Sequence, residues 1–267
     1  MKKKILIIIM IVILIIALGC LIVYFNNKDK VAVLCYHNIA TAEEKSNFSD
    51  EADMIIDIEN FEAQLKFLKQ NNYKTLTLDE FYKWKEGKLK LPVKSVLITF
   101  DDGFLSNYYY AFPLLKKYNM NAAVFVVGEY ADNASQTQWD GNLNTYMPYE
   151  LIEQSKELYP NIEFASHSYG LHYENAISEN TLAQMLDDAQ LYEYSIGETS
   201  YLSYPFGKYN HNFITALQNR NYKMAFIEGP NKNDYRKASL NDDNFKIPRL
   251  NVSHGMELWK FALRLWM

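Results

Sequence analysis

Segments with the apolar pattern of strands alternate with segments of helical periodicity along most of this chain. Short apolar runs typical of buried strands occur at 31–39, 96–100, 121–128, 162–166, 201–204, 222–227 and 245–250. Helices are expected at 58–72, 108–118, 149–158, 178–196, 211–220 and 256–266. The segment 73–87 is expected to hold a short strand and then a helix capped by Thr77 or Asp79. This alternation predicts an α/β fold in which helices cover a parallel sheet, either open or closed into a barrel.

Length and charge narrow the class of protein. The chain has 267 residues, which an α/β barrel can use as a single domain. Its formal net charge is −5, and nucleic-acid-binding proteins usually present a basic face instead. We therefore expect no nucleic-acid partner.

The N-terminus carries the longest apolar run. Three lysines precede 21 uncharged residues, Ile5 to Phe25. At about 1.5 Å per residue, this run would cross a hydrocarbon core of about 30 Å, whereas the core of a signal peptide has roughly 7–15 residues. We predict a membrane anchor over 1–27 and an extracytoplasmic domain over 28–267. The lysines favour a cytoplasmic N-terminus, so the chain would be a single-pass protein of the cell membrane. Cleavage of the run, or lipidation at Cys20, is the alternative.

Two aspartates end one of the predicted strands. Asp101, Asp102 and Gly103 directly follow the apolar run 96–100. In an α/β barrel, catalytic groups lie at the carboxyl ends of the strands. An isolated Asp-Asp-Gly is usually a turn, but its place at this strand end makes it a candidate site.

Histidines follow two other predicted strands. His37 ends the first apolar run, and His167 and His172 follow 162–166. Two imidazoles and a carboxylate are a common ligand set for a divalent metal. An interval of five residues would separate the two rings on a helix or a strand. We therefore expect both on a turn, with Gly170 permitting the tight backbone. An isolated histidine after a strand is more often a hydrogen-bonded polar residue than a ligand.

Three segments, in this order, resemble the polysaccharide deacetylase family, the NodB-homology domain of carbohydrate esterases. They are TFDDG (99–103), SHSYGLH (166–172) and SYPFGKYN (203–210), and the resemblance spans roughly 31–252. The histidine interval of five and the pair Tyr36-His37 are similar to the poly-N-acetylglucosamine deacetylase branch. The resemblance implies a distorted (β/α) barrel of about seven parallel strands. It also implies metal-dependent hydrolysis of N-acetyl groups from an N-acetylglucosamine-type polysaccharide at the bacterial surface, releasing acetate.

The resemblance also implies residue roles. Asp102, His167 and His172 would hold a divalent metal. Zinc suits this ligand set best, and cobalt, nickel, manganese or iron are alternatives. Asp101 would act as general base and His37 as general acid.

A further segment would form the substrate pocket. The resemblance implies that it is lined by Tyr204, Pro205, Phe206 and Gly207. The backbone N–H of Phe206 would bind the oxyanion.

The chain departs from the family pattern at two positions. Many members carry an arginine, paired with the base, where this chain has Leu202. Arg249, at the end of the last predicted strand, would orient Asp101 instead. Many relatives also have a late histidine acid, and His254 is the alternative to His37.

Two other activities fit the same residues. One is an O-acetyl polysaccharide esterase, and the other is a catalytically silent glycan-binding module. The expected partners are an acetylated polysaccharide and, through the anchor, the membrane. The residues do not distinguish exopolysaccharide, peptidoglycan and other wall polymers, and they predict no oligomeric state. Trp139 and the tyrosines of the expected loop 129–148 are candidates for stacking on sugar rings or for pinning that loop.

Overall fold

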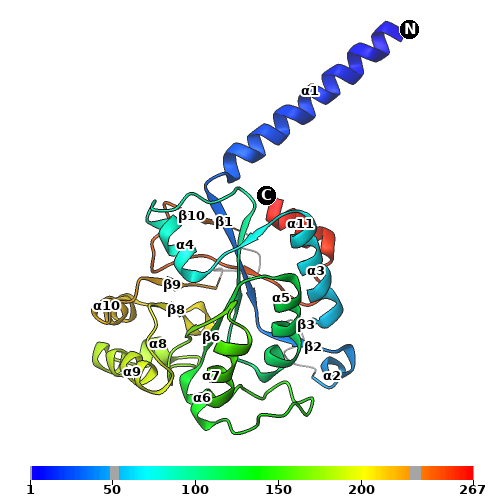
Figure 1. Cartoon of the computed structure of the whole chain (residues 1–267). Coiled ribbons are helices and arrows are strands. Elements are labelled where there is room, and N and C mark those ends of the chain that lie inside the picture. Colours follow the sequence, from blue (N-terminus) through cyan, green and yellow to red (C-terminus); the bar gives the residue numbers. More distant parts are fainter. Residues whose placement is uncertain (1, 49–53, 229–235, 267) are drawn as a thin grey trace.

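The computed structural model describes residues 2–48, 54–228 and 236–266. Its main sheet is curled, and its strands are parallel apart from one short antiparallel edge strand (Figure 1). Neighbouring strands follow the order β1 (Lys30–Tyr36), β5 (Ser95–Phe100), β6 (Ala122–Val126), β7 (Ile162–Ser166), β8 (Tyr201–Ser203) and β9 (Met224–Phe226). Ile247 bridges to β9 and β11 (Leu250–Asn251) pairs with β1, so the segment 247–251 closes the curl. The predicted α/β barrel of about seven parallel strands is confirmed.

The strands are buried on both faces, as parallel strands are when helices cover the sheet. All six residues of β5 are buried. Alternate residues of β1 join different apolar clusters: Ala32 and Leu34 pack in the cluster that contains helix α3, and Val31 and Val33 pack in a second cluster. This burial on both faces explains why the strands appear in the sequence as continuous apolar runs.

Helices cover the sheet where the periodicity predicts them. They are α3 (Ile58–Gln70), α4 (Leu78–Lys85), α5 (Phe112–Tyr118), α7 (Tyr149–Leu158), α9 (Leu182–Ser195), α10 (His211–Asn219) and α11 (Leu258–Trp266). Several begin at well-formed caps. Thr77 caps α4 and Thr181 caps α9, each in a reciprocal capping box.

Some element boundaries differ from the sequence prediction. The run 31–39 breaks at His37, and its second part, β2 (Asn38–Ala40), pairs with β3 (Ile55–Asp57) away from the main sheet. The expected helix 178–196 is two helices, α8 (Ala176–Glu179) and α9, because the cap at Thr181 starts a new helix. The helix expected from residue 108 opens with a π-helical turn, Asn107–Ala111.

Short elements occupy segments expected to be loops. They are α2 (Ala42–Ser46) and α6 (Gly128–Asn133). The short strand expected before α4 is β4 (Lys74–Thr75), and β10 (Ala238–Ser239) pairs antiparallel with β1. The expected loop after β2 also contains residues 49–53, which lie outside the described part of the chain.

Helix α1 (Lys2–Asn27) projects from the barrel and leads into β1 (Figure 1). Its segment Lys4–Asn27 is long and apolar enough to cross a membrane, with a mean hydropathy of 3.7 over its most apolar window. A membrane anchor and a signal sequence both have these properties. The helix leaves the domain at the amino end of β1, whereas α6 and α8 lie at the far end of the barrel (Figure 1).

Candidate active site

Asp101 and Asp102 follow β5 at the carboxyl end of the barrel. The Asp101 N–H donates to the Tyr36 carbonyl oxygen at 2.9 Å, which continues the pairing of β5 with β1. Asp102 then takes a left-handed backbone with φ 69°, a conformation that aspartate tolerates better than most residues. The change of direction gives the two adjacent carboxylates different neighbours.

Asp102 lies with two histidines. Its Oδ1 is 3.4 Å from His167 Nε2 and 3.1 Å from His172 Nε2. The three ligand atoms all lie within 4.8 Å of one another. The structure therefore brings together the three residues that the resemblance names as metal ligands.

Hydrogen bonding leaves the correct nitrogen of His167 facing the cluster. His167 Nδ1 is 2.8 Å from the Ser203 carbonyl oxygen, which can only accept, so Nδ1 carries a proton and Nε2, which faces Asp102, is the nitrogen that could bind a cation. Burial lowers the pKa of His167, but the carboxylates of Asp101 and Asp102 outweigh it and the net pKa is raised. Burial raises the pKa of Asp102, yet the two imidazoles bring it well below its usual range.

The donor set fits a divalent cation. Ligand atoms about 2.1 Å from an ion in tetrahedral geometry lie about 3.4 Å apart, close to the separations of Asp102 from both rings. Two nitrogens and one oxygen suit zinc and its first-row neighbours. Three protein ligands would leave a coordination position for water or substrate, as catalytic sites do.

The turn that carries both histidines is fixed by a buried carboxylate of α9. Asp188 accepts hydrogen bonds from the N–H groups of Tyr169 at 3.0 Å and Gly170 at 2.7 Å. The left-handed residue is Ser168, with φ 67°, and Gly170 does not have a positive φ. The turn that the spacing predicts is present, and its left-handed residue is Ser168 rather than Gly170, which we expected to permit the tight backbone.

Asp101 is paired with Arg249. The Arg249 Nη1 and Nη2 groups donate to Asp101 Oδ1 and Oδ2 at 2.7 and 2.6 Å, and both side chains are buried. Burial raises the pKa of Asp101, but the Arg249 guanidinium outweighs it and lowers that pKa to about 2. Arg249 thus supplies the guanidinium beside Asp101 that Leu202 cannot supply. Leu202 is a buried apolar residue of β8.

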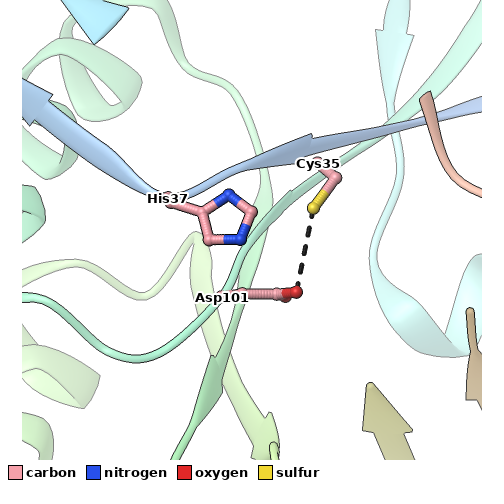
Figure 2. A group of neighbouring side chains, drawn as sticks. All are labelled: Cys35, His37 and Asp101. Carbon is pink, nitrogen blue, oxygen red and sulfur yellow. Dashed lines mark hydrogen bonds between the residues drawn. The ribbon is translucent and has the colours of Figure 1, made fainter. Parts of the chain in front are cut away.

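A second cluster lies beside this pair. Cys35 and His37 point toward Asp101 from the end of β1, and the Cys35 thiol is 3.8 Å from Asp101 Oδ2 (Figure 2). These three ligand atoms also lie within 4.8 Å of one another. Arg249 already engages both Asp101 oxygens, and burial raises the pKa of the Cys35 thiol well above its usual value. This cluster is therefore a poor cation site compared with Asp102, His167 and His172.

A cavity of about 450 Å³ opens over both groups. Its walls comprise His37, Asn38, Met54, Ile55, Asp101, Asp102, Phe104, Tyr130, Tyr146, His167, His172, Phe206, Gly207 and Glu228. The Phe206 ring lies 4.8 Å from the His172 ring, centroid to centroid, and is 47% exposed. Its backbone is left-handed, with φ 55°.

Half of the expected pocket segment is absent from the cavity wall. Tyr204 and Pro205 do not line it, because the Tyr204 ring is buried in a separate apolar cluster with Phe213 and Pro205 is buried as well. Trp139 does not line it either. Its Nε1–H donates to Glu44 Oε1 at 2.6 Å, which pins the loop.

Other wall residues lie outside the motifs, and the sequence suggests only two of them. Phe104, Met54 and Glu228 come from three separate segments and carry no motif. Tyr130 and Tyr146 belong to the loop whose tyrosines were candidates, and their rings pack at 4.4 Å between centroids.

His254 lies in a different cluster from His37. It contacts Lys45, its Nδ1 is 3.8 Å from Asp57 Oδ2, and its side chain is 43% exposed. His254 does not line the cavity that holds His37 and Asp101. Of the two histidines considered as the general acid, only His37 therefore lies in the same cavity as Asp101.

Known proteins resemble this chain in sequence and in fold. The family model described as polysaccharide deacetylase matches residues 88–225. A poly-beta-1,6-N-acetyl-D-glucosamine N-deacetylase of Staphylococcus epidermidis is 30% identical over 250 residues, covering 85% of this chain and 80% of that protein.

Two solved structures share the fold. The deacetylase PplD of Streptococcus pyogenes, in complex with acetate, aligns with a TM-score of 0.72 at 21% identity, over 88% of this chain and 98% of that one. IcaB from Ammonifex degensii aligns with a TM-score of 0.70 at 24% identity, over 90% and 98%.

Proposed function

This chain belongs to the polysaccharide deacetylase family, and from that premise we propose that it hydrolyses N-acetyl groups of a β-1,6-linked N-acetylglucosamine polymer and releases acetate. The observation that carries the proposal is the convergence of Asp102, His167 and His172 beside the buried pair Asp101–Arg249. Amide hydrolysis at neutral pH needs an activated water and a proton for the leaving amine. The cavity holds residue types suited to each task.

We assign the metal site to Asp102, His167 and His172. A divalent ion bound there would lower the pKa of a water and polarise the acetyl carbonyl. Zinc is our first choice among the cations that this ligand set suits. The Ser203 carbonyl and the Asp188-held turn keep the two imidazoles oriented toward Asp102.

Asp101 is proposed as the general base. Its pKa, lowered to about 2, keeps it ionised at neutral pH, so it can accept a proton from an acidified water. The bidentate contact with Arg249 fixes the carboxylate plane. Because Arg249 is buried and does not line the cavity, it serves as a positioning residue.

His37 is proposed as the general acid. It follows the end of β1, its ring points toward Asp101, and it lines the cavity (Figure 2). Asn107 donates to the His37 carbonyl oxygen at 2.7 Å and holds the backbone at this break in the strand. An imidazolium here would protonate the departing sugar nitrogen. The Phe206 N–H is proposed to stabilise the oxyanion of the tetrahedral intermediate.

The substrate class follows from the curated relative and from the cavity walls. Phe104, Tyr130, Tyr146 and Phe206 give the cavity aromatic faces, which suit the apolar faces of sugar rings. The relative's name specifies a β-1,6-linked N-acetylglucosamine polymer. The proposed location is the outer face of the cell membrane, with residues 1–27 as an uncleaved anchor and 28–267 as the catalytic domain.

Acetate release from defined polymers tests this function. Oligomers of β-1,6-linked N-acetylglucosamine should release acetate, and a chelator should stop the release. Faster release from acetylated xylan would indicate an O-acetyl esterase, and faster release from peptidoglycan would move the substrate to the wall. Sugar binding without any acetate release would indicate a silent glycan-binding module and contradict the proposal.

A further inference from the structure

Helix α11 has two apolar stripes, and the protein covers only one of them. Phe261 and Leu265 are buried, and the Phe261 ring packs on Phe67 of α3 at 6.1 Å between centroids. A second stripe consists of Trp259, Leu263 and Trp266, spaced i, i+4 and i+7, which are 60%, 41% and 53% exposed. A surface helix of a soluble domain usually turns its only apolar stripe toward the core. The second stripe therefore requires an explanation.

One lysine borders this stripe, and Trp259 Nε1–H donates to Glu257 Oε2 at 3.0 Å. Lys94 borders the same shallow groove as Trp259, Leu263 and Trp266. Lys94 belongs to the loop between α4 and β5, which also contains the exposed Lys90. Neither lysine has a carboxylate within ion-pair distance in the described part of the chain. Tryptophan together with lysine is the composition of segments that lie at a membrane–water interface.

The stripe lies where α1 leaves the domain. Asn27, the last residue of α1, donates through Nδ2 to the Trp266 carbonyl oxygen at 3.3 Å. Lys237 joins the same two helices, because its Nζ donates to Asn27 Oδ1 at 3.1 Å and to the Leu265 carbonyl oxygen at 2.6 Å. Figure 1 shows α11 and the root of α1 at the same end of the barrel. A bilayer crossed by α1 would begin within a few residues of this junction.

We propose that α11 is a second, interfacial contact with the membrane that α1 crosses. Trp259, Leu263 and Trp266 lie in the boundary between headgroups and acyl chains, and Lys94 faces the anionic headgroups. The inference rests on the proposed anchor. Contact at both α1 and α11 fixes the tilt of the barrel. The cavity, at the opposite end of the strands, then faces away from the bilayer, toward polymer outside the membrane.

Tryptophan quenching by brominated lipid tests this contact in the full chain. The chain is reconstituted in phosphatidylcholine–phosphatidylglycerol vesicles with and without bromine on the acyl chains. Trp259→Phe and Trp266→Phe should each remove about half of the lipid-dependent quenching, and the double variant should remove nearly all of it. Phenylalanine keeps the stripe apolar, so these exposed positions should not disturb folding.

Trp139→Phe is the matched control, because Trp139 lies in the loop over the far end of the barrel, and it should leave the quenching unchanged. Flotation of the same vesicles separates the two hypotheses. A chain that does not float with vesicles contradicts the anchor. A chain that floats but shows no quenching, or quenching that survives the double variant, overturns the α11 contact alone. Protection of Trp259 by a second copy of the chain would give this latter result.

Discussion

At the scale of single residues, one backbone angle separates the tasks of two neighbouring aspartates. The left-handed conformation of Asp102 sends its carboxylate to the two imidazoles, while Asp101 meets Arg249. Adjacent carboxylates would otherwise repel each other in a buried site. Here Asp101 pairs with the Arg249 guanidinium and Asp102 lies beside the two imidazoles, so both carboxylates remain ionised.

Asp101→Asn should abolish acetate release and keep metal and sugar bound. The amide is nearly isosteric but cannot take the proton of a water, and loss of a general base costs on the order of 10²–10⁴-fold in rate. Metal content and oligomer binding, measured on the same preparation, should stay near those of the unmodified chain. Substantial activity in the variant would remove Asp101 from the proposed role.

Arg249→Leu should destabilise the fold as well as lower activity. It leaves the Asp101 carboxylate buried without its cation, and breaking such a pair costs about 3–5 kcal/mol. Arg249→Lys keeps the charge but loses the bidentate geometry, so stability should recover more than kcat does. Thermal unfolding and kcat are measured for both variants. Equal recovery of both would mean that Arg249 has only a structural role.

At the scale of elements, the turn after β7 depends on helix α9. Asp188 of α9 accepts the N–H groups that hold the turn between His167 and His172. The sequence predicts that these histidines share a turn, because neither helix nor strand geometry would bring them together. It does not predict Asp188 or the left-handed Ser168, because both depend on how a distant helix packs.

Asp188→Asn should weaken metal binding by about 10–100-fold, as removal of supporting groups around metal ligands does. The amide would turn an N–H toward backbone N–H groups and disturb the turn. Asp187→Asn, at the neighbouring exposed position, is the control and should bind metal normally. Isothermal titration with zinc measures both, and equal affinities would show that the turn is held without Asp188.

Lys237, at the junction of α1 and α11, should make the stability of the chain depend on pH. Burial and the neighbouring Lys30 lower the pKa of Lys237 to about 8. The unfolded chain therefore binds more protons than the folded one from pH 8 up to the usual lysine pKa of about 10.4, so stability should rise with pH in that range. Lys237→Met should remove this rise. Thermal unfolding of the unmodified chain and of Lys237→Met in detergent, followed by circular dichroism, measures this rise. Parallel pH profiles for the two chains would show that Lys237 does not cause it.

At the scale of the whole molecule, the root of α1 and the candidate site lie at opposite ends of the barrel (Figure 1). Alternating strand and helix patterns predict this barrel, and the strand-end rule places Asp101, Asp102, His37, His167 and His172 at one end. Other parts of the site depend on packing between distant segments. Glu228 and Phe104 reach the cavity from separate elements, and Tyr204 turns into the core although its neighbour Phe206 turns out. No local sequence pattern shows which of Tyr204 and Phe206 is buried, because this depends on how the closed sheet packs against the segments around it.

Metal-dependent acetate release can be tested in a single experiment. The full chain is stripped of metal and assayed on β-1,6-linked N-acetylglucosamine oligomers before and after zinc is restored, beside His172→Gln and, as the control, the exposed His211→Gln. We expect no release without metal, recovery in the unmodified and His211→Gln chains, and no recovery in His172→Gln. Release by the metal-free chain, or full recovery in His172→Gln, would contradict it.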